Sequence, residues 1–207
     1  MARSTRGGDD PATALFARRI APAAALAEQA EAVAAACHAI AVRFHRGGKL
    51  VVFGTGTASA DAQHVAVEFV HPVIVGKRAL PAISLTADVA TVTGIGARSG
   101  MAEIFAHQIR FLAEPADIAL GISPGGNCPS VLRGLSESHE RGMLTVALAG
   151  GDGGAIAASP AVDHLFVARS ADPAVVKEVH VTTYHILWEL VHVFFEQPGV
   201  LPPGVVA

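Results

Sequence analysis

The chain has few cysteines and little excess charge, and each shortage excludes a class of protein. Cys37 and Cys128 lie far apart without a Cys-x-x-Cys spacing, which excludes a disulfide framework and a cysteine-rich zinc site. The formal net charge is −3, with lysine and arginine scattered, so no basic stripe is available for nucleic acid. We therefore expect a cytoplasmic protein, because free thiols suit a reducing compartment, and no direct nucleic-acid partner.

Long apolar runs are also lacking. Residues 1–11 are polar and have no apolar core of the kind that a secretory signal needs. The most apolar later stretch, residues 181–195, includes His185, Glu189 and His192 and is too short and polar to span a bilayer. We expect a soluble protein with no membrane partner. At 207 residues, 51% of them hydrophobic, the chain is long enough for one well-buried domain.

From residue 49 onward, short β-branched runs alternate with segments of helical periodicity. Strands are predicted near 49–53, 80–85, 117–122, 143–148 and 162–167, and helices near 59–70, 100–113, 129–141 and 174–196. This alternation predicts an α/β fold in which helices cover both faces of a parallel sheet, joined by right-handed crossovers.

Both ends of the chain differ from this pattern. Asp10-Pro11 is a typical helix start, and alanine-rich helical sequence continues to about His45. Pro22 is expected to break this stretch into two helices. Residues 1–10 are expected to form a flexible N-terminus, and Pro198–Ala207 a loose tail.

Glycine- and hydroxyl-rich segments follow three of the predicted strands, at 54–59, 122–130 and 150–154. In an open parallel sheet, ligands collect at the carboxyl ends of the strands. The first segment, Gly54-Thr55-Gly56-Thr57-Ala58-Ser59, also opens a helix, where free N–H groups and the helix dipole favour an anion. We interpret it as a phosphate or sugar-phosphate site; simple connecting turns would contain the same glycines, and that alternative stays open.

The helix after the first segment carries His64 and Glu68, which share one face because they are four residues apart. An imidazole and a carboxylate therefore lie together near a possible anion site, although a solvated pair would show the same spacing. The late helix carries His180, His185 and His192, for which packing in a core or an interface is the alternative to function.

These segments together resemble a known family. The order Gly-x-Gly-x-x-x-Ala-Asp-Ala-Gln-His-x-x-x-Glu, Gly-Ile-Ser-x-x-Gly-Asn, Gly-x-Asp-Gly-Gly and Glu-x-His-x-x-x-x-His over residues 12–197 is similar to sugar isomerase (SIS) domains, and within them to the sedoheptulose 7-phosphate isomerases. The resemblance implies a flavodoxin-like three-layer α/β/α sandwich spanning 11–197, with helices in 11–46 that build a homotetramer. It implies aldose–ketose isomerisation of a phosphorylated sugar through an enediol, with Glu68 as base and His185 as acid.

Some members of the family bind zinc, and the resemblance places that site at His64, Glu68, His185 and Lys177. Lys177 stands where the family has glutamine, and an ammonium group is not a metal ligand. We therefore expect no cofactor and disfavour zinc. A Lys177–Glu68 ion pair is the alternative that keeps the carboxylate ionised without a metal.

The substrate-binding positions that the resemblance implies depart from the family at several points. Gly125 and Cys128 replace serines, Pro124 has no N–H, and Arg98 replaces an aspartate. Lost hydroxyl donors weaken the binding of a phosphate ester, so we expect an altered ligand. A non-catalytic SIS module that binds a sugar phosphate or a protein is the alternative function. The expected binding set is Gly54, Thr55, Gly56, Thr57, Ser59, Arg98, Ser123, Gly125, Asn127, Cys128, Ser130 and Lys177.

Overall fold

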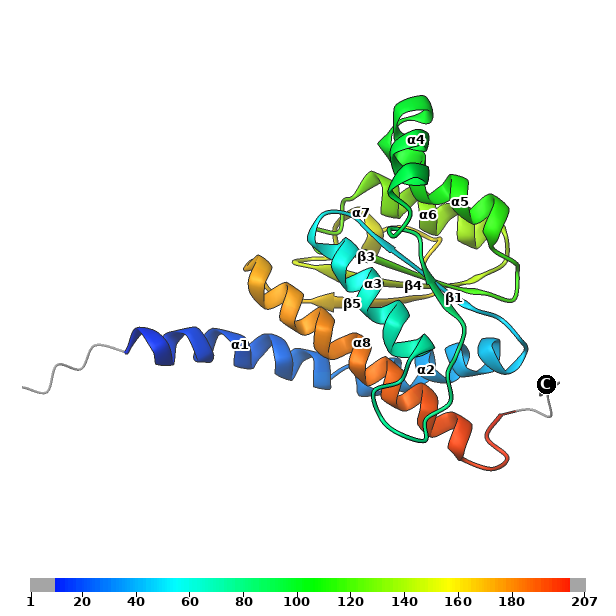
Figure 1. The fold of residues 1–207 in the computed structure, drawn as a ribbon. Helices are drawn as coiled ribbons and strands as arrows, with labels where there is room; N and C mark the ends of the chain where they lie inside the picture. Colours follow the sequence, from blue (N-terminus) through cyan, green and yellow to red (C-terminus); the bar gives the residue numbers. More distant parts are fainter. Residues whose placement is uncertain (1–9, 202–207) are drawn as a thin grey trace, which may run out of the picture.

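A computed structural model describes residues 10–201 of the chain. Its centre is a five-stranded sheet of order β2-β1-β3-β4-β5, in which every neighbouring pair is parallel (Figure 1). The strands are β1 (Leu50–Gly54), β2 (Ala82–Ser84), β3 (Ile118–Ser123), β4 (Leu144–Gly150) and β5 (His164–Ala168). Every residue of β1, β3 and β4 is buried, as expected when helices cover both faces of a parallel sheet.

Two hydrophobic clusters separate the helices into two layers. Because side chains alternate along a strand, Leu50 and Val52 join one cluster while Val51 and Phe53 join the other. The first layer holds α2 (Ala30–His45), α3 (Thr57–Val70) and α8 (Pro173–Glu196), and α1 (Pro11–Ala27) joins it through Leu26, which packs with α8 in a third, smaller cluster. The second layer holds α4 (Val89–Ser99), the 3₁₀ turn η1 (Met101–Glu103), α5 (Ile104–Leu112), α6 (Pro129–Glu140) and α7 (Gly154–Ala157). The predicted three-layer α/β/α class is confirmed.

The N-terminal helices show one wrong prediction. Asp10 caps α1 by accepting a hydrogen bond from the Ala12 N–H at 3.4 Å, and Pro11 occupies the first turn, as predicted. Pro22, however, lies inside α1 and does not break it; its ring is buried, and that burial offsets the hydrogen bond that proline cannot make. The break comes at Glu28–Gln29, where α1 and α2 meet at a bend of 60°.

No single helix within residues 10–201 has the length and apolar character needed to cross a membrane. By length and composition alone, the bent α1–α2 pair meets that description when its two helices are taken together.

The segment before the predicted 100–113 helix contains a helix that the sequence pattern did not predict. Asp88 starts α4 by accepting a hydrogen bond from the Thr91 N–H at 3.1 Å, and the helix projects from the body of the molecule (Figure 1). Its two glycines and several β-branched residues have low helix propensity, which conceals it in the sequence.

The two ends of the chain lie largely outside the described residues. Of the predicted tail, residues 198–200 form a turn, and Leu201 packs against the core cluster that includes α8. The predictions of flexible segments at 1–9 and 202–207 fall on residues outside 10–201.

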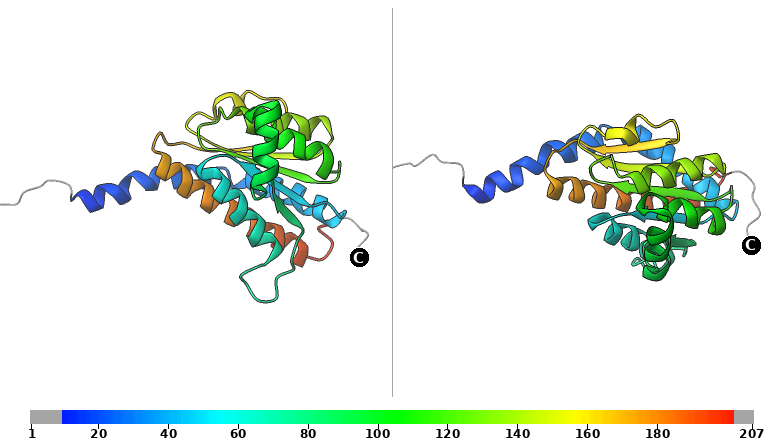
Figure 2. Two further views of the ribbon diagram at one scale, coloured as in Figure 1. Left: turned by 45° about the horizontal axis from the view of Figure 1, so that its top comes forward. Right: turned by 90° about the horizontal axis from the view of Figure 1, so that it is seen from above.

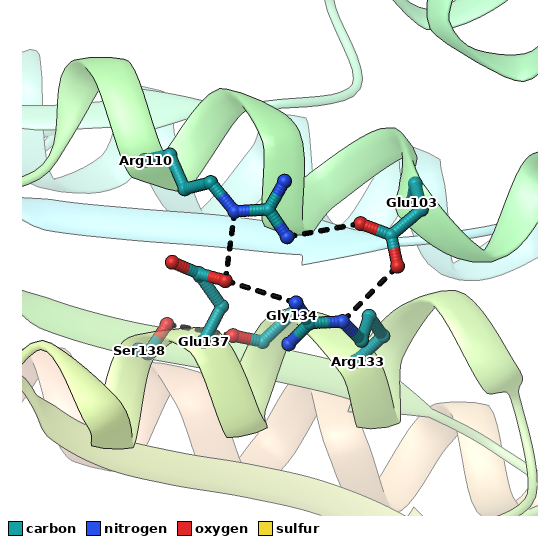
Figure 3. A network of polar contacts seen from close by, with 6 residues as sticks. All are labelled: Glu103, Arg110, Arg133, Gly134, Glu137 and Ser138. Atoms are coloured by element: carbon teal, nitrogen blue, oxygen red, sulfur yellow. Dashed lines mark hydrogen bonds and ion pairs between the residues drawn. The ribbon is translucent and has the colours of Figure 1, made fainter. Parts of the chain in front are cut away.

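An ion-pair network joins α5 and α6 on the second layer (Figure 3). Arg110 and Arg133 both contact Glu137, at 2.9 and 3.1 Å, and both contact Glu103, at 3.1 and 3.0 Å. The Glu137 side chain is only 9% exposed, so the two guanidinium groups neutralise a nearly buried carboxylate.

Candidate active site

Helices α3 and α8 pack side by side and run parallel, in a constant register. Side-chain contacts join residue pairs that are 120 positions apart: Thr57 with Lys177, His64 with Tyr184, and Glu68 with Trp188. The Trp188 indole N–H donates to the main-chain oxygen of Glu68 at 2.9 Å. This register decides which residues of the two helices can meet.

The register brings His64, Glu68 and His185 together, as the family resemblance implied. One potential ligand atom from each lies within 4.8 Å of the others. His64 Nε2 lies 3.1 Å from Glu68 Oε1, and the two side chains are 43% and 13% exposed. A carboxylate, an imidazole and a second imidazole thus converge in a partly accessible place, where they can exchange protons with a ligand.

Tyr184 completes this cluster, and sequence reasoning missed it. Its hydroxyl lies 2.9 Å from His64 Nδ1, while its ring is buried in the core. Burial raises the pKa of the Tyr184 hydroxyl, and the negative charges of Asp61 and Glu68 raise it further. The signal that was available is its place directly before His185, as the only tyrosine of the chain.

Lys177 pairs with Asp61 rather than with Glu68, so the alternative ion pair is wrong. Lys177 Nζ lies 2.7 Å from Asp61 Oδ1, and the Asp61 side chain is 6% exposed. The reason is the helix register: Lys177 precedes His185 by eight residues, about 12 Å along α8, which places it level with the start of α3.

The His64, Glu68 and His185 donors fit a metal site with three protein ligands, the arrangement that catalytic zinc uses. Lys177, the fourth position that the resemblance implies, is directed to Asp61 instead. Within residues 10–201, these three residues form the only such group of histidine, cysteine and acidic residues. The expectation that zinc is disfavoured stays a prediction.

His180 and His192, by contrast, are core residues. His180 Nε2 lies 2.9 Å from the Ala149 carbonyl oxygen, and His192 contacts the Trp188 and Arg78 carbonyl oxygens at 2.8 and 2.9 Å. Burial lowers the pKa of the His180 imidazole. The packing interpretation of these two histidines is confirmed.

The loops after β1 and β3 meet at the carboxyl edge of the sheet. Thr55 Oγ1 lies 3.1 Å from Cys128 Sγ, which in turn lies 3.3 Å from Ser130 Oγ. The Cys128 N–H donates to Ser123 Oγ at 3.3 Å. Burial opposes ionisation of the Cys128 thiol, but hydrogen bonds from Ser130, Thr55 and main-chain amides outweigh it and lower the pKa of that thiol.

A cavity beside the β1–α3 loop lies between that loop and the α4–α5 region. The Ser59 hydroxyl donates to the Gly56 carbonyl oxygen at 2.7 Å, and Thr86, which sequence reasoning missed, donates to the Ser59 carbonyl oxygen at 3.3 Å. Ser59 and Glu68 are nine residues apart and so face opposite sides of α3, whereas Thr57 shares the Glu68 side. The lining is Gly54, Thr55, Gly56, Ser59, Thr86, Val92, Met101, Ile104 and Phe105.

Of the remaining predicted binding residues, Asn127 stabilises the loops, whereas Gly125 and Arg98 are exposed. Asn127 fixes the loops: its Nδ2 donates to the Gly125 carbonyl oxygen at 2.8 Å, and its Oδ1 accepts from the Ala155 N–H at 2.9 Å. Gly125 is exposed. Arg98 is exposed in the last turn of α4 and does not line the cavity.

A family model for the SIS domain matches residues 17–150. The chain belongs to the SIS-domain family. Curated relatives include the phosphoheptose isomerases of Solidesulfovibrio magneticus, 41% identical over 85% of each chain, and of Aquifex aeolicus, 39% identical over 73% of this chain and 78% of that protein.

Solved structures agree with this SIS-domain assignment. Phosphoheptose isomerase from Neisseria gonorrhoeae matches with a TM-score of 0.79 at 30% identity, over 87% of this chain and 96% of that one. The Francisella tularensis phosphoheptose isomerase matches with a TM-score of 0.81 at 31% identity, over 87% and 95%. The resemblance to phosphoheptose isomerases among SIS domains is confirmed.

Proposed function

We propose that this SIS domain interconverts the aldose and ketose forms of a phosphorylated sugar, with Glu68 as base and His185 as acid. The observation that carries the proposal is the convergence of these side chains and His64 within 4.8 Å, from two helices far apart in the sequence. Relatives that are named phosphoheptose isomerase support the reaction class.

The chemistry needs one proton moved between adjacent carbons. Glu68 takes a proton from the carbon beside the carbonyl, the released electron pair forms the C=C bond of an enediol, and Glu68 returns the proton to the neighbouring carbon. His185 supplies a proton to the carbonyl oxygen and recovers one from the adjacent hydroxyl. A metal held by His64, Glu68 and His185 would polarise the carbonyl as a Lewis acid.

We infer the ligand class from the start and the middle of α3. The helix begins at the glycine-rich loop, where N–H groups favour an anion, and His64 lies seven residues beyond Thr57, about 10 Å along the axis. A sugar with a terminal phosphate has its charge and its carbonyl at opposite ends. Because Gly125 and Cys128 offer no hydroxyl, the proposal includes a ligand other than sedoheptulose 7-phosphate.

A coupled isomerase assay over pentose, hexose and heptose phosphates tests the proposal. Wild type should convert at least one of them, and Glu68→Gln should lower kcat by about 10²- to 10⁴-fold, because the general base is lost. Glu189→Gln, which removes an exposed carboxylate from α8, is the matched control and should keep normal turnover. If wild type converts none of the panel, the proposal fails.

A non-catalytic binding module is the second candidate, favoured by the missing hydroxyls at Gly125 and Cys128. Calorimetry separates the two: a module would bind a sugar phosphate without turnover, and Glu68→Gln would leave its affinity unchanged.

A further inference from the structure

Tyr184 and His64 are polar side chains of the cluster that take no part in the proposed proton transfers. The Tyr184 ring belongs to the buried core between α3, α8 and the sheet, yet its hydroxyl reaches His64 Nδ1 at 2.9 Å. On the other side of the same imidazole, Nε2 lies 3.1 Å from the Glu68 carboxylate. The three groups form a chain of hydrogen bonds from the core to the proposed base.

We propose that Tyr184 is a positioning residue that holds His64 as the neutral tautomer with its proton on Nε2, so that His64 orients the Glu68 carboxylate. The inference rests on the proposed function for the role of Glu68. It requires no ligand beyond the residues present.

The direction of each hydrogen bond follows from the groups involved. An ionised carboxylate only accepts, so the His64 nitrogen that faces Glu68 must carry a proton. In a neutral imidazole the other nitrogen, Nδ1, is then an acceptor, and a tyrosine hydroxyl is a donor that fits it. The opposite tautomer would aim a lone pair at the carboxylate. Tyr184 therefore donates to Nδ1, and His64 donates to Glu68.

The same arrangement also packs the His64 ring against the proposed acid. Tyr184 and His185 are neighbours on α8, and the His64 ring packs edge-on against both of their rings, with centroids 5.4 and 5.3 Å apart. The His64 ring is therefore fixed by packing as well as by its two hydrogen bonds. Glu68 keeps one carboxylate oxygen on His64, which leaves the other for a substrate proton.

Nitrogen-15 NMR of histidine-labelled protein tests the tautomer directly, with the His64 signal assigned by its loss in His64→Gln. Wild type should show His64 protonated on Nε2 and bare on Nδ1. Tyr184→Phe removes the donor to Nδ1, so the tautomer with its proton on Nε2 should lose population and His64 should show a mixture of the two neutral tautomers. A neutral His64 protonated on Nδ1 in wild type would overturn the proposal.

Thr183→Val is the matched control, because it removes a buried hydroxyl one residue away, which donates to the Val179 carbonyl oxygen at 2.7 Å. It should leave the His64 pattern unchanged. In turnover, Tyr184→Phe should lower kcat roughly tenfold or more with KM altered less than about twofold, because it misorients the base, while Thr183→Val changes neither. Equal His64 patterns in the two variants would refute the role of Tyr184.

A second measurement keeps the Tyr184 hydroxyl in place and changes its acidity. Tyr184 is the only tyrosine of the chain, so growth on 3-fluorotyrosine alters this one hydroxyl and no other. The His64 Nδ1 resonance should then shift while the other histidines stay in place; an unmoved His64 signal would overturn the proposal. The NMR results do not depend on turnover, so they decide the role of Tyr184 in the tautomer even if the isomerase assay fails.

Discussion

Gly125 and Cys128 are the two positions of the β3–α6 loop where the resemblance to phosphoheptose isomerases implies serines. An added Cβ at Gly125 would meet no atom within 4 Å, so a serine fits there. Cys128 is nearly isosteric with serine, and its Sγ already lies within 3.3 Å of two hydroxyls. The loop therefore has room for a serine at both positions and offers no hydroxyl at either one.

Restoring hydroxyl donors at these two positions should restore the binding of a phosphate ester. The double variant Gly125→Ser, Cys128→Ser should bind sedoheptulose 7-phosphate at least about tenfold more tightly, or about 1.4 kcal/mol, because each hydroxyl donates to the anion. Calorimetry measures the change, and Ala35→Ser, an exposed addition on α2, should have no effect. Tight binding and normal turnover of this substrate by wild type would contradict the proposed change of ligand.

The zinc content of the protein depends on the side chains of the cluster between α3 and α8. Lys177 is engaged by Asp61 at 2.7 Å, so among residues 10–201 no fourth protein ligand joins His64, Glu68 and His185. A site with three protein ligands makes fewer bonds to zinc than a closed site with four, so we predict that the protein loses zinc during purification and retains less than one per chain. Elemental analysis before and after dialysis against a chelator measures it. Stoichiometric zinc that is lost in His64→Ala would contradict the prediction.

Helices α5 and α6 are joined by an ion-pair network in which Glu137 is the less exposed of two carboxylates. Glu137 accepts from both Arg110 and Arg133 and is nearly buried (Figure 3). Because the arginines also contact Glu103 and are about one-third exposed, each retains a partner and access to water if the charge of Glu137 is lost.

Glu137→Gln should therefore lower the free energy of unfolding by only about 1 kcal/mol. Urea unfolding at equal protein concentration measures the change, since assembly shifts apparent stability. Glu140→Gln, an exposed glutamate on the same helix, should change it by less than half as much. Equal effects of the two variants would show that the network contributes nothing.

Over the whole molecule, α1 is the element whose apolar surface one chain leaves uncovered. It extends away from the sheet (Figure 2), and Leu15, Phe16 and Ile20 are 50, 72 and 68% exposed. Isolated apolar residues on a surface need no explanation, but three on one projecting helix are typical of an interface between subunits.

We predict a homotetramer in which α1 and α2 pack between subunits. Light scattering at micromolar concentration should give the mass of four chains for wild type, and Phe16→Ser with Ile20→Ser should reduce it, because apolar contacts are lost. Val75→Ser, at a fully exposed loop position, is the control and should keep the wild-type mass. A monomeric wild type would contradict the prediction.

Local pattern alone determined the alternation of strands and helices, the parallel sheet and the loops at the strand exits, because burial on both faces and turn chemistry are visible in a short stretch of chain. The spacing of His64 and Glu68 predicted their contact for the same reason. Two features were not predicted where helix propensity is low. Helix α4 contains two glycines, and Pro22 stays inside α1, where it is buried by packing.

Tertiary structure alone decided which residues of α3 meet which of α8. The contacting residues are 120 positions apart, because strands β2 to β5 lie between the two helices in the sequence. No local pattern therefore predicts that Tyr184 contacts His64, or that Lys177 pairs with Asp61 and not with Glu68. The opposite orientation of Ser59 and Glu68 on α3 was readable from helix periodicity. Which side of α3 contacts α8, and which side lines the cavity, depended on how the two helices pack on one sheet.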